Sequence, residues 1–145
     1  MGREVTSRAR LLSWDPKTYK ESSEEVATPD EVARRAADLL ERYKTTAGRY
    51  PGLQLETDNR SWGSLAIGVA PFGWTLIHSS EDGLTQHCTK VTGTNGGPEI
   101  PIEWDQETTI PRNFFVSEQV ALKGVSQWLK DGTLAPDLPW DDHCY

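Results

Sequence analysis

The segment from residue 64 to residue 83, SLAIGVAPFGWTLIHSSEDG, constrains the fold more than any other part of the chain. Apolar residues alternate with small or polar ones on both sides of Pro71–Gly73, which is the period of half-buried β-strands. Proline and glycine between the two runs predict a hairpin turn, and Ser79–Gly83 predicts a second turn before a strand around Gln86 to Val91. We therefore expect an antiparallel sheet at the centre of the fold.

Two segments with a helical period lie on either side of this region. The first begins with a capping box at Thr28 and Glu31, and its apolar spacing predicts a helix from Pro29 to about Thr46. The second begins near Ser117 and ends before Gly132, the residue type that most often terminates a helix. Residues 1–145 are therefore expected to form a single α+β domain, with two main helices and an antiparallel sheet of about five to six strands.

Three further strands are indicated less strongly. Leu53 and Leu55 alternate with polar neighbours, and a strand from Val5 to Trp14 is weakly marked. In EIPIEW, residues 99–104, alternation places Ile100, Ile102 and Trp104 on one side of a strand. It places Pro101, Glu103 and the following Asp105 on the other side, and the proline predicts that this strand lies at a sheet edge.

Composition limits the class of protein. The chain is 36% hydrophobic and 26% charged, which is too apolar for a disordered segment and too polar for a membrane protein. No apolar run approaches the length of about 20 residues that spans a bilayer, and MGREVTSRAR lacks the apolar part of a secretory signal. We expect a cytoplasmic location, which favours two free thiols at Cys88 and Cys144 and leaves a disulfide between them as the alternative.

Catalytic signatures are scarce in this chain. There is no C-x-x-C or H-E-x-x-H spacing, so we expect no metal and no cofactor. His78, His87 and Cys88 fall on predicted neighbouring strands, which leaves a small hydrolase-like enzyme with a Cys-His pair as an alternative. Direct binding of nucleic acid is not expected, because no basic patch interleaved with aromatic residues is present.

Aromatic and acidic residues occur together late in the chain. The whole chain has a net charge of -7. Residues 61–145 contain eleven acidic and only four basic residues, so the negative charge is concentrated there. Such a surface attracts a basic protein. The expected partner-binding residues are Glu81, Asp82, Glu103, Asp105, Glu107, Asp137, Asp141 and Asp142. Beside them, the expected structural anchors are Trp74, Trp104, Trp128 and Trp140. We expect Trp74, Trp104 and Trp128 to fill the space between helix and sheet.

The order of residues in the C-terminal part resembles a known family. The positions that carry this resemblance are Ile110-Pro111, Phe115-Val116-Ser117, Ala121, Val125, Trp128-Leu129, Gly132, Pro136 and Trp140. Together they resemble the C-terminal signature of the Imm1 family of bacterial immunity proteins, and residues 64–83 are similar to its middle strands. The chain departs from the family pattern at Arg112 to Phe115, which lengthen the connection into the last helix.

The resemblance implies a protein without enzymatic activity that binds and neutralises a cognate secreted toxin. In this family the toxin is commonly a deaminase that acts on nucleic acid, such as a cytidine deaminase, whose active-site cleft should be basic. An acidic protein could cover or plug such a cleft. A general adaptor that binds a basic peptide along the edge from Ile100 to Trp104 is a further alternative.

Overall fold

A computed structural model describes residues 8–44, 48–91, 96–142 and 144. Its elements in chain order are β1 (Ala9–Trp14), β2 (Glu21–Val26), α1 (Pro29–Tyr43), β3 (Tyr50–Thr57), the 3-10 turn η1 (Arg60–Trp62), β4 (Ser64–Ala70), β5 (Gly73–Ser79), β6 (Gln86–Thr89), β7 (Glu99–Glu103), β8 (Glu107–Pro111), the 3-10 turn η2 (Arg112–Phe114), α2 (Glu118–Asp131) and β9 (Trp140–Asp141).

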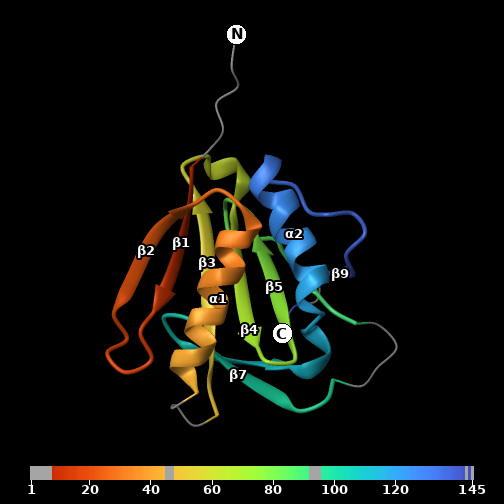
Figure 1. The fold of residues 1–145 in the computed structure, drawn as a ribbon. Coiled ribbons are helices and arrows are strands. Elements are labelled where there is room, and N and C mark those ends of the chain that lie inside the picture. The colour runs from red at the N-terminus through yellow and green to blue at the C-terminus, as the bar shows by residue number, and fades with distance from the viewer. Residues whose placement is uncertain (1–7, 45–47, 92–95, 143, 145) are drawn as a thin grey trace.

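The strands form one large sheet in the order β2-β1-β3-β4-β5-β6-β9, to which the β7–β8 hairpin is added through β3 (Figure 1). All pairings are antiparallel except a short parallel one between β3 and β7. The α+β class with two main helices is confirmed, but the described residues contain nine strands, more than the expected five to six. The strands that were not predicted are β2, β8 and the two-residue β9.

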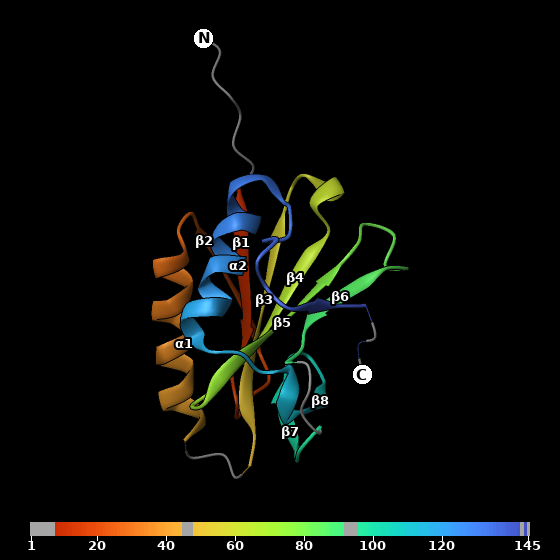
Figure 2. The ribbon, with the colours of Figure 1, turned by 90° about the vertical axis from the view of Figure 1, so that its right-hand side faces the viewer.

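Both helices cover the same face of the sheet, as the two ribbon views show together (Figures 1 and 2). The capping box of α1 is confirmed: the Glu31 amide donates to the Thr28 hydroxyl, and the Glu31 carboxylate accepts from the Thr28 amide. Ser117 caps α2, and Gly132 ends it in the left-handed conformation. The predicted end of the first helix, Thr46, lies outside the described residues. Within the described part of the chain, neither helix is long and apolar enough to cross a membrane.

The main core lies between these helices and the sheet. The inward residues of β3 and β4, such as Leu55 and Ile67, are fully buried against α1 and α2. Trp74 and Trp128 also belong to this core, as expected for anchors between helix and sheet. The turns at Pro71–Gly73 and Ser79–Gly83 join antiparallel strands, which confirms the alternation read in the central segment.

A second core lies on the opposite face, where the β7–β8 hairpin and η2 cover the sheet. Trp104 belongs to this core, so the expectation that it packs between helix and sheet is wrong. Two glycines make room for the hairpin. Gly52 in β3 and Gly68 in β4 are register partners, and a Cβ on either would press on Trp104 or Ile102 of the hairpin.

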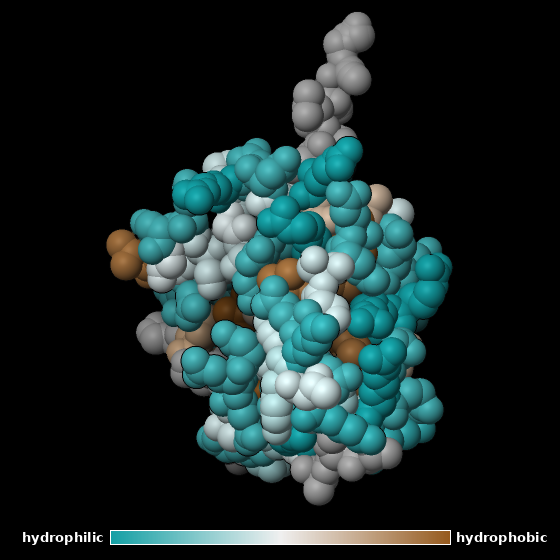
Figure 3. All heavy atoms as spheres, turned by 90° about the vertical axis from the view of Figure 1, so that its left-hand side faces the viewer, coloured by the Kyte–Doolittle hydropathy of each residue, from teal (hydrophilic) through white to brown (hydrophobic). Residues whose placement is uncertain are grey.

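The strand β2 forms one end of the sheet, and five of its six residues are exposed. Its sequence, ESSEEV, has no apolar alternation, because neither face of the strand is covered. The side of the molecule where β2 lies is mostly hydrophilic (Figure 3). Hollows between β2 and α1 have Glu25, Val26 and Glu31 in their linings.

We predict that Gly52→Ala destabilises the protein by about 1–3 kcal/mol, the usual range for overpacking a core. The new Cβ would lie 2.5 Å from Cδ1 of Trp104, so the indole ring would have to move. Denaturant unfolding of the purified variant measures the change in the free energy of unfolding.

Gly96→Ala is the matched control, because a Cβ there would meet Pro111 at an ordinary contact distance of 3.8 Å. Its free energy of unfolding should change far less. Equal stability of wild type and Gly52→Ala would contradict the close packing of Trp104 on this strand.

Candidate protein-interaction site

The eight acidic residues expected to bind a partner lie on three separate segments. Two are in the β5–β6 turn, three are in or beside the β7–β8 turn, and three follow α2. The exposed members are Glu81, Asp82, Asp105, Glu107, Asp137 and Asp142. Asp141 is half-buried and Glu103 is buried. The predicted residues therefore do not all have the same access to a partner.

Several of these carboxylates already have neighbours of their own. Asp82 accepts hydrogen bonds from the Leu84 amide and the Ser80 hydroxyl within its own turn, and these bonds lower the pKa of Asp82. Asp137 lines a hollow together with Lys123 and Lys130, so its surroundings are basic. Asp82 therefore stabilises its own turn, and the charge of Asp137 is offset by the two nearby lysines. Both are weaker candidates for binding a cationic partner.

The β7–β8 turn presents acidic residues on a fixed support. The indole of Trp104 is buried, and its Nε1 donates to the Leu53 carbonyl at 2.8 Å. The Trp104 amide also donates to the Gln106 carbonyl, which closes the turn. Asp105 and Glu107 are exposed on either side of Gln106. The buried Trp104 thus fixes a turn on which Asp105 and Glu107 are exposed. This is the arrangement expected from a tryptophan followed by acidic residues in the sequence.

Glu103 does not belong to this exposed set, and its prediction as a partner-binding residue is wrong. Only 5% of it is accessible, and its carboxylate forms an ion pair with Arg49. The parallel pairing of Tyr50 and Pro51 with the end of β7 brings the start of β3 beside Glu103. Burial raises the pKa of Glu103, Arg49 opposes that shift, and the nearby Glu107 adds to it.

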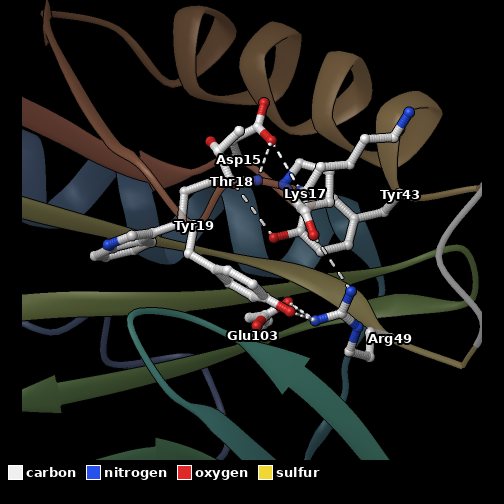
Figure 4. Close-up of polar contacts among 9 residues, drawn as sticks. Asp15, Lys17, Thr18, Tyr19, Tyr43, Arg49 and Glu103 are labelled. Carbon is white, nitrogen blue, oxygen red and sulfur yellow. Dashed lines mark hydrogen bonds and ion pairs between the residues drawn. The ribbon is translucent and has the colours of Figure 1, made fainter.

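Tyr19 lies over the same arginine (Figure 4). Its hydroxyl accepts from Nη1 of Arg49 at 3.3 Å, the same nitrogen that contacts Glu103. Tyr19 has a positive φ of 60°, which is uncommon for a bulky residue. Asp15 holds the loop in this shape by accepting from the Lys17 and Thr18 amides, and these bonds lower the pKa of Asp15.

Tyr19 is the aromatic residue most open to solvent in this region, with 55% of its surface exposed. Tyr43 is the opposite case, because it is buried and its hydroxyl donates to the Trp14 carbonyl. Burial raises the pKa of Tyr43 to about 12. We define the β7–β8 site as the exposed residues Tyr19, Asp105 and Glu107. Arg49 contacts both Tyr19 and the buried Glu103 beneath this surface.

The alternative of a Cys-His enzyme fails on the geometry of the sheet. His78 and His87 are register partners across β5 and β6 and share one face. Cys88 follows His87 in the strand, so it points to the opposite face, where it is fully buried in the second core. A sheet layer therefore separates the thiol from both imidazoles, and neither can act as its base.

His78 has a structural role in the helix-side layer. Its Nε2 lies 2.8 Å from the Trp62 carbonyl, which can only accept, so Nε2 carries the proton. The Trp128 indole donates to the same carbonyl at 3.1 Å. Among the described residues, no group of three or more His, Cys, Asp or Glu is placed to hold a metal ion.

Two other expectations concern the ends of the sheet. The predicted free edge from Ile100 to Trp104 is only partly present, because β7 pairs with β8 on one side, and Ile102 and Glu103 also pair with Tyr50 and Pro51 of β3 on the other. Trp140 serves as an anchor as expected: it is half-buried, it packs against the main core, and its Nε1 donates to the Ala135 carbonyl at 2.8 Å.

Tyr19 and Arg49 were missed by the sequence analysis. The turn sequence DPKT, beginning at Asp15, predicts a tight loop after β1 and could have placed Tyr19 at its end. No local signal connects Arg49 with Glu103, because their contact depends on the parallel pairing of β3 with β7.

No protein-family profile matches this chain, and no curated protein sequence matches it.

We predict that Arg49→Met destabilises the protein by about 3 kcal/mol at neutral pH, because it leaves Glu103 buried without its partner. Without the guanidinium, the pKa of Glu103 in the folded state lies further above its unfolded value. The folded state then retains a proton that the unfolded chain has released. The loss of stability should therefore be smallest in acid and grow as the pH rises through the folded-state pKa.

Unfolding curves at several pH values measure this effect, and adding Glu103→Gln to Arg49→Met should recover part of the loss. The control is Arg8→Met, because the Arg8–Glu25 pair is largely exposed and should contribute little. The same loss in both variants, or a loss independent of pH, would contradict the role of Arg49.

Proposed function

We propose that this protein is an immunity protein: it binds a secreted toxin with a basic active-site cleft and neutralises it stoichiometrically, in the cytoplasm of the producing cell. The observation that carries the proposal is the β7–β8 site. Two exposed carboxylates, Asp105 and Glu107, project from a turn whose Trp104 is fixed in the core. A fixed acidic turn loses little conformational entropy when it binds a basic surface.

The neighbouring tyrosine favours binding of a protein over simple solvation. Tyrosine and arginine are enriched among the residues that dominate binding energy at protein interfaces. Tyr19 adds an exposed aromatic ring that is linked through Arg49 to Glu103, the residue before Trp104, and its loop is held by the hydrogen bonds of Asp15. The ring of Tyr19 supplies apolar contact area, and Asp105 and Glu107 supply negative charge, while Lys17 and Lys20 are exposed bases in the loop of Tyr19. Apolar area together with the acidic turn suits a partner that is cationic and partly apolar.

The class of toxin comes from the resemblance to the Imm1 family. A deaminase acting on nucleic acid must bind a polyanion, so the residues around its active site should be basic. An acidic turn that enters this cleft would compete with the nucleic acid for the same basic residues. Inhibition by occupancy needs no reaction on the immunity protein, which agrees with the separation of Cys88 from both histidines.

We predict that Asp105→Lys/Glu107→Lys slows association with the cognate toxin about tenfold or more at low salt, because it reverses the charge that attracts a basic cleft. The partner to use is a purified deaminase domain encoded beside this protein's gene. Stopped-flow or surface-based kinetics measure association, and a deamination assay with increasing amounts of the protein measures inhibition.

The matched control is Glu24→Lys, which reverses an exposed carboxylate on β2 and should leave association nearly unchanged apart from the general effect of net charge. If both variants associate like wild type while inhibition persists, the β7–β8 site is not the binding surface. Failure of the wild-type protein to inhibit any such domain would reject the proposed function itself.

We also predict that Tyr19→Asn weakens toxin binding about 30-fold or more, in the range of one interface hot-spot residue, without unfolding the loop. Asparagine tolerates the positive φ that this position requires, so the backbone should keep its shape. Calorimetric titration gives the affinity, and thermal unfolding confirms that the variant is folded. Unchanged affinity in a folded variant would remove Tyr19 from the interface.

A further inference from the structure

Cys88 and Cys144, the two cysteines of the chain, meet in the structure although 55 residues separate them in the sequence. Cys88 is in β6, whose residues 88 and 89 pair with Asp141 and Trp140 of β9. Cys144 follows this strand. Both thiols donate to one acceptor, the carbonyl oxygen of Asp141, at 3.5 Å from Cys88 and 3.8 Å from Cys144.

The two thiols are also close enough that each affects the pKa of the other. Cys88 is fully buried in the second core, and Cys144 packs against that core while remaining half-exposed. Burial raises the pKa of both thiols, and it does so most strongly for Cys88. The pair therefore has one member that a small oxidant can reach and one that only the neighbouring sulfur can reach.

We propose that Cys88 and Cys144 form an oxidation site that closes reversibly into an intramolecular disulfide. The geometry supports this because both sulfurs already converge on one carbonyl oxygen, so neither strand has to leave the sheet. The site does not depend on the proposed toxin binding, since it lies at the β6–β9 edge and not at the β7–β8 turn.

The oxidant belongs to the class of small peroxides, and hydrogen peroxide is the simplest member. Cys144 reacts as its thiolate: the sulfur attacks one peroxide oxygen, the O–O bond breaks, and the displaced hydroxide with the Cys144 proton leaves as one water molecule, which gives a sulfenic acid on Cys144. Because burial raises the pKa of Cys144, this step should be faster at alkaline pH than at neutral pH. The sulfur of Cys88 then displaces the hydroxyl group, which leaves as a second water molecule with the Cys88 proton. Two thiols are oxidised to one disulfide, and one peroxide is reduced to two water molecules. A dithiol reductant reverses the change.

The disulfide would fix the end of the chain to the sheet. β9 contributes only Trp140 and Asp141 to the pairing with β6, so the closing strand is short. A covalent bond next to this pairing closes a long loop that contains β7, β8 and α2. Closing a loop of this length restricts the unfolded chain and stabilises the folded one.

The test uses the full-length protein, treated with hydrogen peroxide and then with dithiothreitol. Mass spectrometry should show the loss of two hydrogen atoms in a monomer and a peptide pair joined through Cys88 and Cys144. The melting temperature should rise by about 5 °C or more on oxidation and return on reduction. Hydrogen exchange of the β6 and β9 amides should slow in the oxidised form.

Cys144→Ser is the control, because serine is similar in size and its hydroxyl can donate to the same Asp141 carbonyl. This variant should fold, and peroxide should leave both its melting temperature and its β9 exchange unchanged. Oxygen adducts on Cys144 with Cys88 still open to alkylation after unfolding would overturn the proposal. Disulfide-linked dimers, or a protein unchanged by peroxide, would do so too.

Discussion

The fit of Trp104 against Gly52 and of Ile102 against Gly68 is the constraint on which the second half of this structure depends. Gly52 and Gly68 face each other in adjacent strands, and the absence of side chains there lets Trp104 and Ile102 lie directly on the sheet. The indole then donates to the Leu53 carbonyl and fixes the hairpin to β3. Because this contact holds the β7–β8 turn, it also determines where the exposed carboxylates lie. Stability and the candidate binding site therefore share one packing contact.

The parts of the fold with regular apolar spacing could be predicted from the sequence. The capping box of α1, the glycine after α2 and the alternation in β4 and β5 are local patterns, and each is present in the structure. The strand β2 could not be found in this way, because five of its six residues are exposed and polar, so no apolar alternation marks it. β9 is too short to show any period. β2 is defined by its hairpin pairing with β1, and β9 by its pairing with β6, which is distant in sequence.

The candidate site shows the same division. Trp104 and Trp140 are each followed by acidic residues in the sequence, and both were expected to be anchors. In the structure each indole donates a hydrogen bond to a backbone carbonyl, of Leu53 and Ala135 respectively. Alternation alone placed Glu103 on the solvent side of its strand, and it failed because Arg49 and the start of β3 cover that side. Tyr19 contributes through a loop conformation that no apolar pattern reports. Contacts between distant segments thus decide which acidic residues are accessible and which are structural.

The open strand β2 has a consequence for encounters between copies of this protein. A terminal strand offers unpaired backbone groups, and such edges can join into continuous sheets. Here Glu21, Glu24 and Glu25 are all exposed along that edge. Antiparallel pairing of two copies through β2 would bring their glutamates together, and the repulsion would oppose growth of an intermolecular sheet. The acidic edge therefore protects the protein against aggregation at an end of the sheet that the described residues leave uncovered.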